Sequence, residues 1–245
     1  MRNFLTCSFL TILLAATGCH KESVSVPNNN IVPNDFLSDK KYDKLVVEIQ
    51  YVSGNAPAAA TLDNLQTFLQ QRLNKSSGIS ITQNAIPSPG KTAYSLDDVQ
   101  NIEKASRTQT TNDKTLTAYF LFVDGDYASN SGNSKVLGFA YGSSSMTIFE
   151  KTIKGLSGGI GQPTVTVLES TVLLHEFGHI LGLVNNGTPM QAAHQDVPHG
   201  KHCDDQNCLM YYTVETSDVV ANLVGAGIPA LNTSCLNDLK SNGGK

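Results

Sequence analysis

Tryptophan is absent, charged residues make up only 16% of the 245 residues, and the formal net charge is a modest −4. Lysine and arginine never collect into a basic stripe. Nothing therefore points to a nucleic-acid partner or to binding at an anionic membrane surface. No internal repeat is found. Behind a targeting segment, the length suits one domain of roughly 200 residues, which is large enough for a hydrophobic core.

A long apolar run is also missing, because the apolar stretch at residues 4–16 is shorter than the about 20 residues of a membrane-spanning helix. Arg2 precedes this stretch, and small residues lead from it into Cys19. The segment resembles a bacterial lipoprotein signal. We expect residues 1–18 to be removed and lipid on Cys19 to anchor the chain in the cell envelope, at the outer membrane or cell surface. Plain secretion with an incidental cysteine is the alternative.

Residues 19–40 have the composition of a flexible tether, since Ser, Val, Pro and Asn dominate and no period appears. The folded domain is then expected over residues 41–245. β-Branched and apolar runs predict strands at 45–52, 79–86 and 116–123, and a hairpin from 136–141 and 146–153. Apolar residues at helical spacing predict helices at 57–73 and 96–105, the second capped by Ser95. This order predicts an α+β domain with a mixed β-sheet, packed helices and an irregular C-terminal part.

A third helix, expected from Pro163 to Leu181, carries the pattern HExxH at residues 175–179. His175 and His179 lie four residues apart, so both imidazoles can reach one metal ion from the same face. Glu176 can then face a water on that ion and act as its general base. Two His and a Glu in an apolar helix are costly without such a role. The pattern predicts a catalytic Zn²⁺ site.

The continuation to HEFGHILG at residues 175–182 resembles the metzincin zinc peptidases, in which the glycine turns the chain and brings back a third histidine. That pattern places a histidine at position 185, where this chain has Asn185. Further on, residues 202–210 read HC-x4-CxM, which resembles the archaemetzincin branch. The resemblance implies a metzincin-like fold, His202 as the third zinc ligand and an inserted loop at 183–201.

Alternatives for the third ligand stay open. His194 and His199 lie in the same loop, and the remaining alternatives are Asn185 and a site completed by solvent alone. The resemblance further implies that Met210 packs beneath the metal. It also gives Tyr212 a catalytic role, stabilising the tetrahedral intermediate, although Tyr212 can equally be a packing residue.

Cysteine usage argues against a second ion. Archaemetzincins carry a structural zinc on four cysteines, whereas only Cys203, Cys208 and Cys235 remain here once Cys7 and Cys19 are set aside. One ligand is missing and an exported protein meets oxidising conditions, so we expect a disulfide, first of all Cys203–Cys208, and no second zinc.

These observations predict a membrane-anchored zinc metalloendopeptidase that acts on peptides or proteins, with His175, His179 and His202 on the metal. Two alternatives remain. One is a zinc-containing surface protein that binds a ligand without activity, and the other is a zinc amidase of envelope polymers. An intact Glu176 argues against the first, because a purely structural site does not need that carboxylate.

Overall fold

The structure, a computed structural model, describes residues 30–245. The predicted signal segment, the lipid on Cys19 and residues 19–29 of the predicted tether lie outside these residues. Within them, no helix is both long and apolar enough to cross a membrane.

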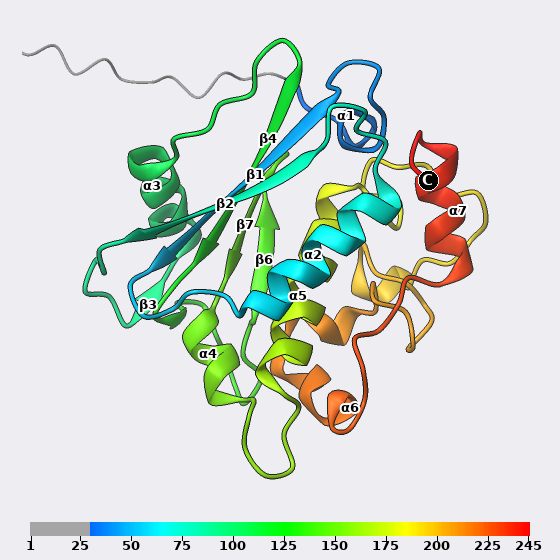
Figure 1. Ribbon diagram of the computed structural model, residues 1–245. Helices are drawn as coiled ribbons and strands as arrows, with labels where there is room; N and C mark the ends of the chain where they lie inside the picture. Colours follow the sequence, from blue (N-terminus) through cyan, green and yellow to red (C-terminus); the bar gives the residue numbers. More distant parts are fainter. Residues whose placement is uncertain (1–29) are drawn as a thin grey trace, which may run out of the picture.

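A five-stranded mixed sheet forms the centre of the domain, in the order β2-β1-β4-β7-β6 (Figure 1). Its strands are β1 (Lys44–Val52), β2 (Ile79–Ile86), β4 (Thr115–Phe122), β6 (Gly138–Tyr141) and β7 (Ser145–Ile148). The pairs β1·β2, β1·β4 and β4·β7 are parallel, while the edge strand β6 runs antiparallel to β7. Parallel neighbours require crossover connections, which the helices α2 (Ala59–Arg72) and α3 (Leu96–Ser106) supply. The predicted α+β class with a mixed sheet is confirmed.

Each face of the sheet has its own core. Alternate residues of β4 point to opposite faces, so Phe120 and Phe122 belong to one cluster and Tyr119 and Leu121 to the other. The larger core lies between the sheet and the helices α2 and α5 (Val165–Ile180). The smaller core lies on the side of α3, where Val99 is buried. The Ser95 cap of α3 is as predicted, since its hydroxyl accepts from the Asp98 amide.

Helix α5 carries the HExxH residues and is held firmly to the sheet. Its Phe177 ring meets Phe120 of β4 edge-to-face, with ring centroids 5.7 Å apart. A similar contact at 5.9 Å joins Phe177 to Phe36. The helix begins at Val165 rather than at Pro163, because the Thr164 side chain accepts from the Val167 amide and caps it there. Aromatic packing therefore fixes the helix that presents the two histidines.

The prediction of a tether up to residue 40 was wrong for its last part. Pro33–Leu37 forms helix α1, and both Phe36 and Leu37 are completely buried. Proline and asparagine suggested a flexible segment, but Pro33 is a first-turn helix residue and the aromatic and leucine side chains enter the core. The folded part of the chain therefore includes α1.

The predicted strand at 146–153 is half wrong. It ends at Ile148, and Glu150–Gly155 forms helix α4. Glu150 and Lys154 pair across one helical turn at 3.1 Å, and Ile153 is buried one turn after Phe149. Two short strands, β3 (Ala93–Tyr94) and β5 (Asp126–Tyr127), pair with each other and were not predicted.

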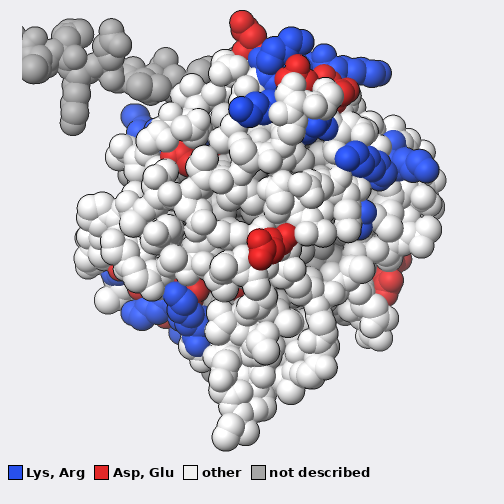
Figure 2. All heavy atoms as spheres, in the orientation of Figure 1, with Lys and Arg blue, Asp and Glu red and all other residues white. Residues whose placement is uncertain are grey.

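Beyond α5 the chain is mostly irregular, as predicted. It contains three short 3-10 helices, η1 (Val197–His199), η2 (Tyr212–Glu215) and η3 (Ser217–Val219). The helices α6 (Val220–Leu223) and α7 (Thr233–Ser241) complete this part. On the face of the molecule shown in Figure 2, charged side chains form small separate groups among uncharged residues, so this face carries no continuous basic stripe.

Candidate metal centre

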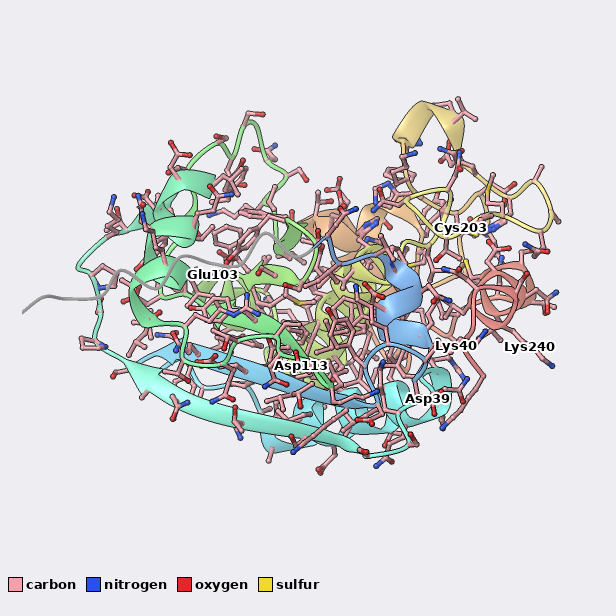
Figure 3. All side chains as sticks on the ribbon, turned by 90° about the horizontal axis from the view of Figure 1, so that it is seen from above. Asp39, Lys40, Glu103, Asp113, Cys203 and Lys240 are labelled. Atoms are coloured by element: carbon pink, nitrogen blue, oxygen red, sulfur yellow. The ribbon has the colours of Figure 1, made fainter. Side chains whose placement is uncertain are left out.

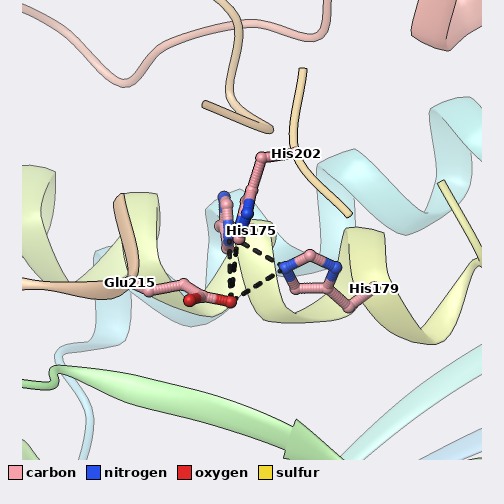
Figure 4. A group of neighbouring side chains, drawn as sticks. All are labelled: His175, His179, His202 and Glu215. Atoms are coloured by element: carbon pink, nitrogen blue, oxygen red, sulfur yellow. Dashed lines mark hydrogen bonds and ion pairs between the residues drawn. The ribbon is translucent and has the colours of Figure 1, made fainter. Parts of the chain in front are cut away.

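Three histidines and one carboxylate meet at the open side of α5. His175 and His179 lie one turn apart on the helix, with their Nε2 atoms 3.1 Å apart. His202 reaches them from the loop beyond the helix, and Glu215 comes from η2 (Figure 4). One donor atom from each of the four residues lies within 4.8 Å of the others. The structure thus brings together all three histidines that the sequence proposed as ligands.

Two of the three imidazoles are oriented for coordination by hydrogen bonds on the ring nitrogen that faces away from the group. Nδ1 of His175 lies 2.7 Å from the Leu209 carbonyl oxygen, and Nδ1 of His202 lies 2.6 Å from that of His199. A carbonyl oxygen can only accept, so both Nδ1 atoms donate and both Nε2 atoms keep a lone pair for a metal ion. Burial lowers the pKa of His179 to about 4, which keeps its ring neutral as a ligand must be.

The return of the chain to the metal site begins at Gly182. Its φ of +74° is left-handed, and a Cβ there would overlap Pro33 and the Thr188 backbone. Residues 183–201 then form the predicted loop, with η1 as the helical turn within it. An isolated β-bridge between Gln195 and Cys203 closes the loop and places His202 beside α5.

The other candidates for a third ligand lie elsewhere. Asn185 is exposed at a φ of +59°, and its carbonyl accepts from Lys201. His199 pairs with Asp196 at 2.6 Å and its side chain is 44% exposed. His194 is buried, but it faces a group of cysteines described below.

Met210 packs directly under the helix turn that carries the two histidines. A Cβ on Gly178 would overlap the Met210 sulfur, so only glycine permits this close approach. The Cys203 amide donates to the Met210 carbonyl at 2.8 Å, which ties the residue after His202 to the same turn. Met210 therefore supports the floor of the histidine group.

Glu176 is a buried carboxylate without a hydrogen-bond partner in the structure. It is completely buried, and neither of its oxygens has a hydrogen-bond partner. It lines a cavity of about 300 Å³ together with His179, His202 and residues of the edge strand β6. Burial, with the nearby Glu215 charge, raises the pKa of Glu176 well above its usual value. An unpaired buried carboxylate beside three converging Nε2 atoms fits a site that holds a cation and a water molecule.

Tyr212 lies at the margin of this site. Its ring stacks on His199 at a centroid distance of 3.7 Å, and it is not among the residues that line the cavity. The structure thus does not place Tyr212 with the three histidines, and its catalytic role stays a prediction.

A second group of potential ligands, here called the thiol cluster, consists of His194, Cys203, Cys208 and Cys235. Figure 3 shows Cys203 beside α7, the helix that carries Cys235. Nδ1 of His194 lies 3.5 Å from Cys203 Sγ and 3.9 Å from Cys235 Sγ. The Sγ atoms of Cys208 and Cys235 are 3.7 Å apart.

The predicted Cys203–Cys208 disulfide is not formed in the structure, in which all three thiols are free and buried. A disulfide needs an S–S distance of about 2.05 Å. Tetrahedral Zn–S bonds of about 2.3 Å instead separate two sulfurs by about 3.8 Å. Hydrogen bonds from the neighbouring thiols lower the pKa of Cys208 to about 3. His194 is the fourth donor that the cysteine count seemed to lack.

Sequence reasoning missed Glu215 and the role of His194. Glu215 follows Met210 by five residues without any motif to mark it. His194 was considered only for the catalytic ion. Asp238 was also missed: it is buried on α7 and holds Nε2 of His194 at 2.7 Å, which turns Nδ1 toward the thiols. His194, Asp238 and the thiols come together only because the loop that carries His194 packs on α7.

The mixed sheet, helix α5 packed against it and the three-histidine group together form an α+β domain with a candidate metal centre. Comparison with solved structures then gives the particular likeness. Archaemetzincin from Methanopyrus kandleri matches with a TM-score of 0.55 and 15% identity, over 82% of this chain and 96% of that one. This likeness shows an archaemetzincin-like fold and confirms the resemblance predicted from the sequence.

Two further structures are more distant. A zinc-dependent peptidase from Methanocorpusculum labreanum has a TM-score of 0.47 and 14% identity, over 79% of this chain and 99% of that one. Metalloproteinase-II from Bacteroides fragilis has a TM-score of 0.48 and 15% identity, and the match spans 84% of this chain but only 54% of that protein. No protein-family model matches the sequence, and no curated protein does.

Proposed function

We propose that this protein is a zinc-dependent peptidase. One observation carries the proposal: an orphaned, fully buried Glu176 lines the same cavity as the two histidines His179 and His202, whose partner His175 completes the donor set. The archaemetzincin-like fold agrees with it. Three imidazoles are the donor type that Zn²⁺ favours in catalytic sites.

The residues of the site have two roles, which are binding of the metal ion and transfer of a proton. His175, His179 and His202 hold the ion, and the backbone carbonyls of Leu209 and His199 keep two of the rings in place. Zinc bound there supplies a Lewis acid that polarises a peptide carbonyl and acidifies water. Glu176 accepts the proton of the attacking water and delivers it to the leaving amine.

The edge strand β6 offers a place for the substrate. Phe139 and Ala140 of this strand line the cavity beside Glu176 and His179. An extended peptide can pair with an exposed strand edge, which would place its carbonyl group near the histidines. Assaying a mixed peptide library against cell-wall fragments separates a peptidase from an amidase of envelope polymers, and hydrolysis of neither would favour a binding protein without activity.

Removal of the third ligand tests the metal site. His202→Ala should weaken zinc binding by more than about tenfold and abolish most peptide hydrolysis, because two histidines and water hold zinc poorly. Metal content after dialysis against a weak chelator measures the first effect. His199→Ala is the matched control, since His199 lies in the same loop but is exposed and paired with Asp196. Full zinc retention by His202→Ala would refute the assignment.

We further propose that the mature chain is anchored in a bacterial envelope through lipid on Cys19. The support is the small residues before this cysteine. Cys19→Ser should move the protein from the membrane fraction to the soluble fraction, as measured by fractionation and immunoblotting. Cys7→Ser is the control and should stay with the membrane. An unchanged distribution of the Cys19→Ser variant would exclude the anchor.

A second zinc ion in the thiol cluster is also part of the proposal. The expectation of a single ion depended on a missing ligand, and His194 supplies a donor at that place. His194, Cys203 and Cys235 lie within 4.8 Å of one another, and Cys208 lies 3.7 Å from Cys235. If all four bound one ion, no position would be left for water, so this ion would be structural. It would join the loop that carries His202 to α7.

A further inference from the structure

The carboxylate of Glu215 lies among the three histidine rings of the candidate metal centre. Its Oε1 lies 3.1 Å from Nε2 of His202 and 3.2 Å from Nε2 of His179. The distance to Nε2 of His175 is 3.9 Å. Figure 4 shows the carboxylate pointing into the space between the three rings. No other carboxylate in residues 30–245 belongs to this donor group.

The two shorter distances are close to those expected between the donors of a four-coordinate ion. Zn–N and Zn–O bonds of about 2.0–2.2 Å in a tetrahedron place neighbouring donors about 3.3–3.5 Å apart. The Glu215 oxygen lies near that spacing from Nε2 of His202 and His179, and somewhat farther from Nε2 of His175. All four donor atoms lie within 4.8 Å of one another. We infer that Glu215 is a fourth protein ligand of the proposed catalytic ion, which closes the site in its resting state. This inference rests on the proposed metal site at the three histidines.

Glu215 differs from the histidines in being easy to displace. The side chains of His175, His179 and His202 are 0%, 9% and 9% exposed, whereas that of Glu215 is 36% exposed. It also lines the cavity, so a molecule that enters the cavity can take its position. A partly exposed carboxylate on a short 3-10 helix can leave the ion without unfolding the core.

The backbone of Glu215 is tied to the strand at which we expect substrate to bind. The Leu137 amide donates to the Glu215 carbonyl at 2.8 Å, one residue before β6 begins. The Ser217 amide donates to the Lys135 carbonyl at 2.7 Å, and Val136 and Thr216 form a β-bridge. A peptide that pairs with β6 would therefore contact the segment that holds the carboxylate. Substrate binding and release of Glu215 are coupled through this bridge.

Azide binding to the cobalt-substituted protein tests the inference, because azide reports an open coordination position without any turnover. Glu215→Gln keeps the size of the side chain but removes its charge and most of its strength as a ligand. We expect the azide-induced change in visible absorption to occur at an at least about tenfold lower azide concentration in this variant. Its zinc dissociation constant should also rise by about tenfold or more. The thiol cluster is the same in all variants and cancels in the difference spectrum.

Asp218→Asn is the matched control, since it removes one exposed negative charge three residues away. It should behave like the unmodified protein, which excludes a general charge effect. If Glu215→Gln bound azide and zinc with the same affinities as the unmodified protein, the inference would be overturned. An unchanged melting temperature of Glu215→Gln would show that altered affinities do not result from a folding defect. Absence of peptidase activity would affect the proposed function alone. If cobalt binding did not depend on His202, both proposals would fall.

Discussion

Replacing Glu176 by glutamine should lower peptide hydrolysis by about 10²- to 10⁴-fold while the metal content stays unchanged. Glutamine has the size of glutamate and fits the same buried position, but it cannot accept a proton. Glu176 is not part of the donor group, so the metal should remain. Initial rates on a cleaved peptide, together with metal analysis of the same sample, measure both effects.

Glu169→Gln is a matched control for this experiment. Glu169 lies seven residues earlier on α5 and is also completely buried, yet its oxygens accept from the Ala58 amide and the Thr61 hydroxyl, away from the histidines. Glu169→Gln should hydrolyse the peptide at a near-normal rate when both proteins are assayed at a temperature at which they are fully folded. Near-normal hydrolysis by Glu176→Gln would disprove its role as general base, whereas loss of metal would show that it supports binding instead.

Most of the elements could be predicted because local patterns determine them. The runs at 79–86 and 116–123 became β2 and β4 almost at the expected limits, and Ser95 caps α3. The errors occurred where tertiary contacts overrule local signals. Phe36 was predicted to lie in a tether because its neighbours are prolines and asparagines, but its contact with Phe177 holds it in the core.

The residues of the candidate site also fall into those that local spacing predicts and those that tertiary contacts place. His175, Glu176 and His179 were found together because a helix fixes their spacing. His202 required the resemblance, because the long loop separates it from α5. Glu215 and His194 could not have been placed, because their positions depend on the β-bridge between Val136 and Thr216 and on the packing of α7. No spacing rule in the sequence describes either contact.

The second large effect is expected at the thiol cluster, where His194→Ala should remove a zinc ion and destabilise the whole domain. A ligand present at about 1,000 times its dissociation constant stabilises the folded state by about 4 kcal/mol. For a domain of this size, that corresponds to a fall in melting temperature of about 10 °C. Thermal unfolding and metal analysis, with and without a strong chelator, measure the two quantities. The chelator should lower the melting temperature of the unmodified protein but hardly change that of the variant.

His199→Ala, in the same loop but exposed, serves as the control for His194→Ala and should unfold like the unmodified protein. The cluster also distinguishes metal binding from oxidation, since Cys208 and Cys235 are close enough to be oxidised if no ion protects them. Peptide mapping of the purified protein without reductant should recover all three thiols unpaired. A Cys208–Cys235 disulfide with only one zinc per chain would show that the cluster is a covalent link instead. In that case His194→Ala should have little effect on metal content, because the remaining zinc would lie at the three histidines near Glu176.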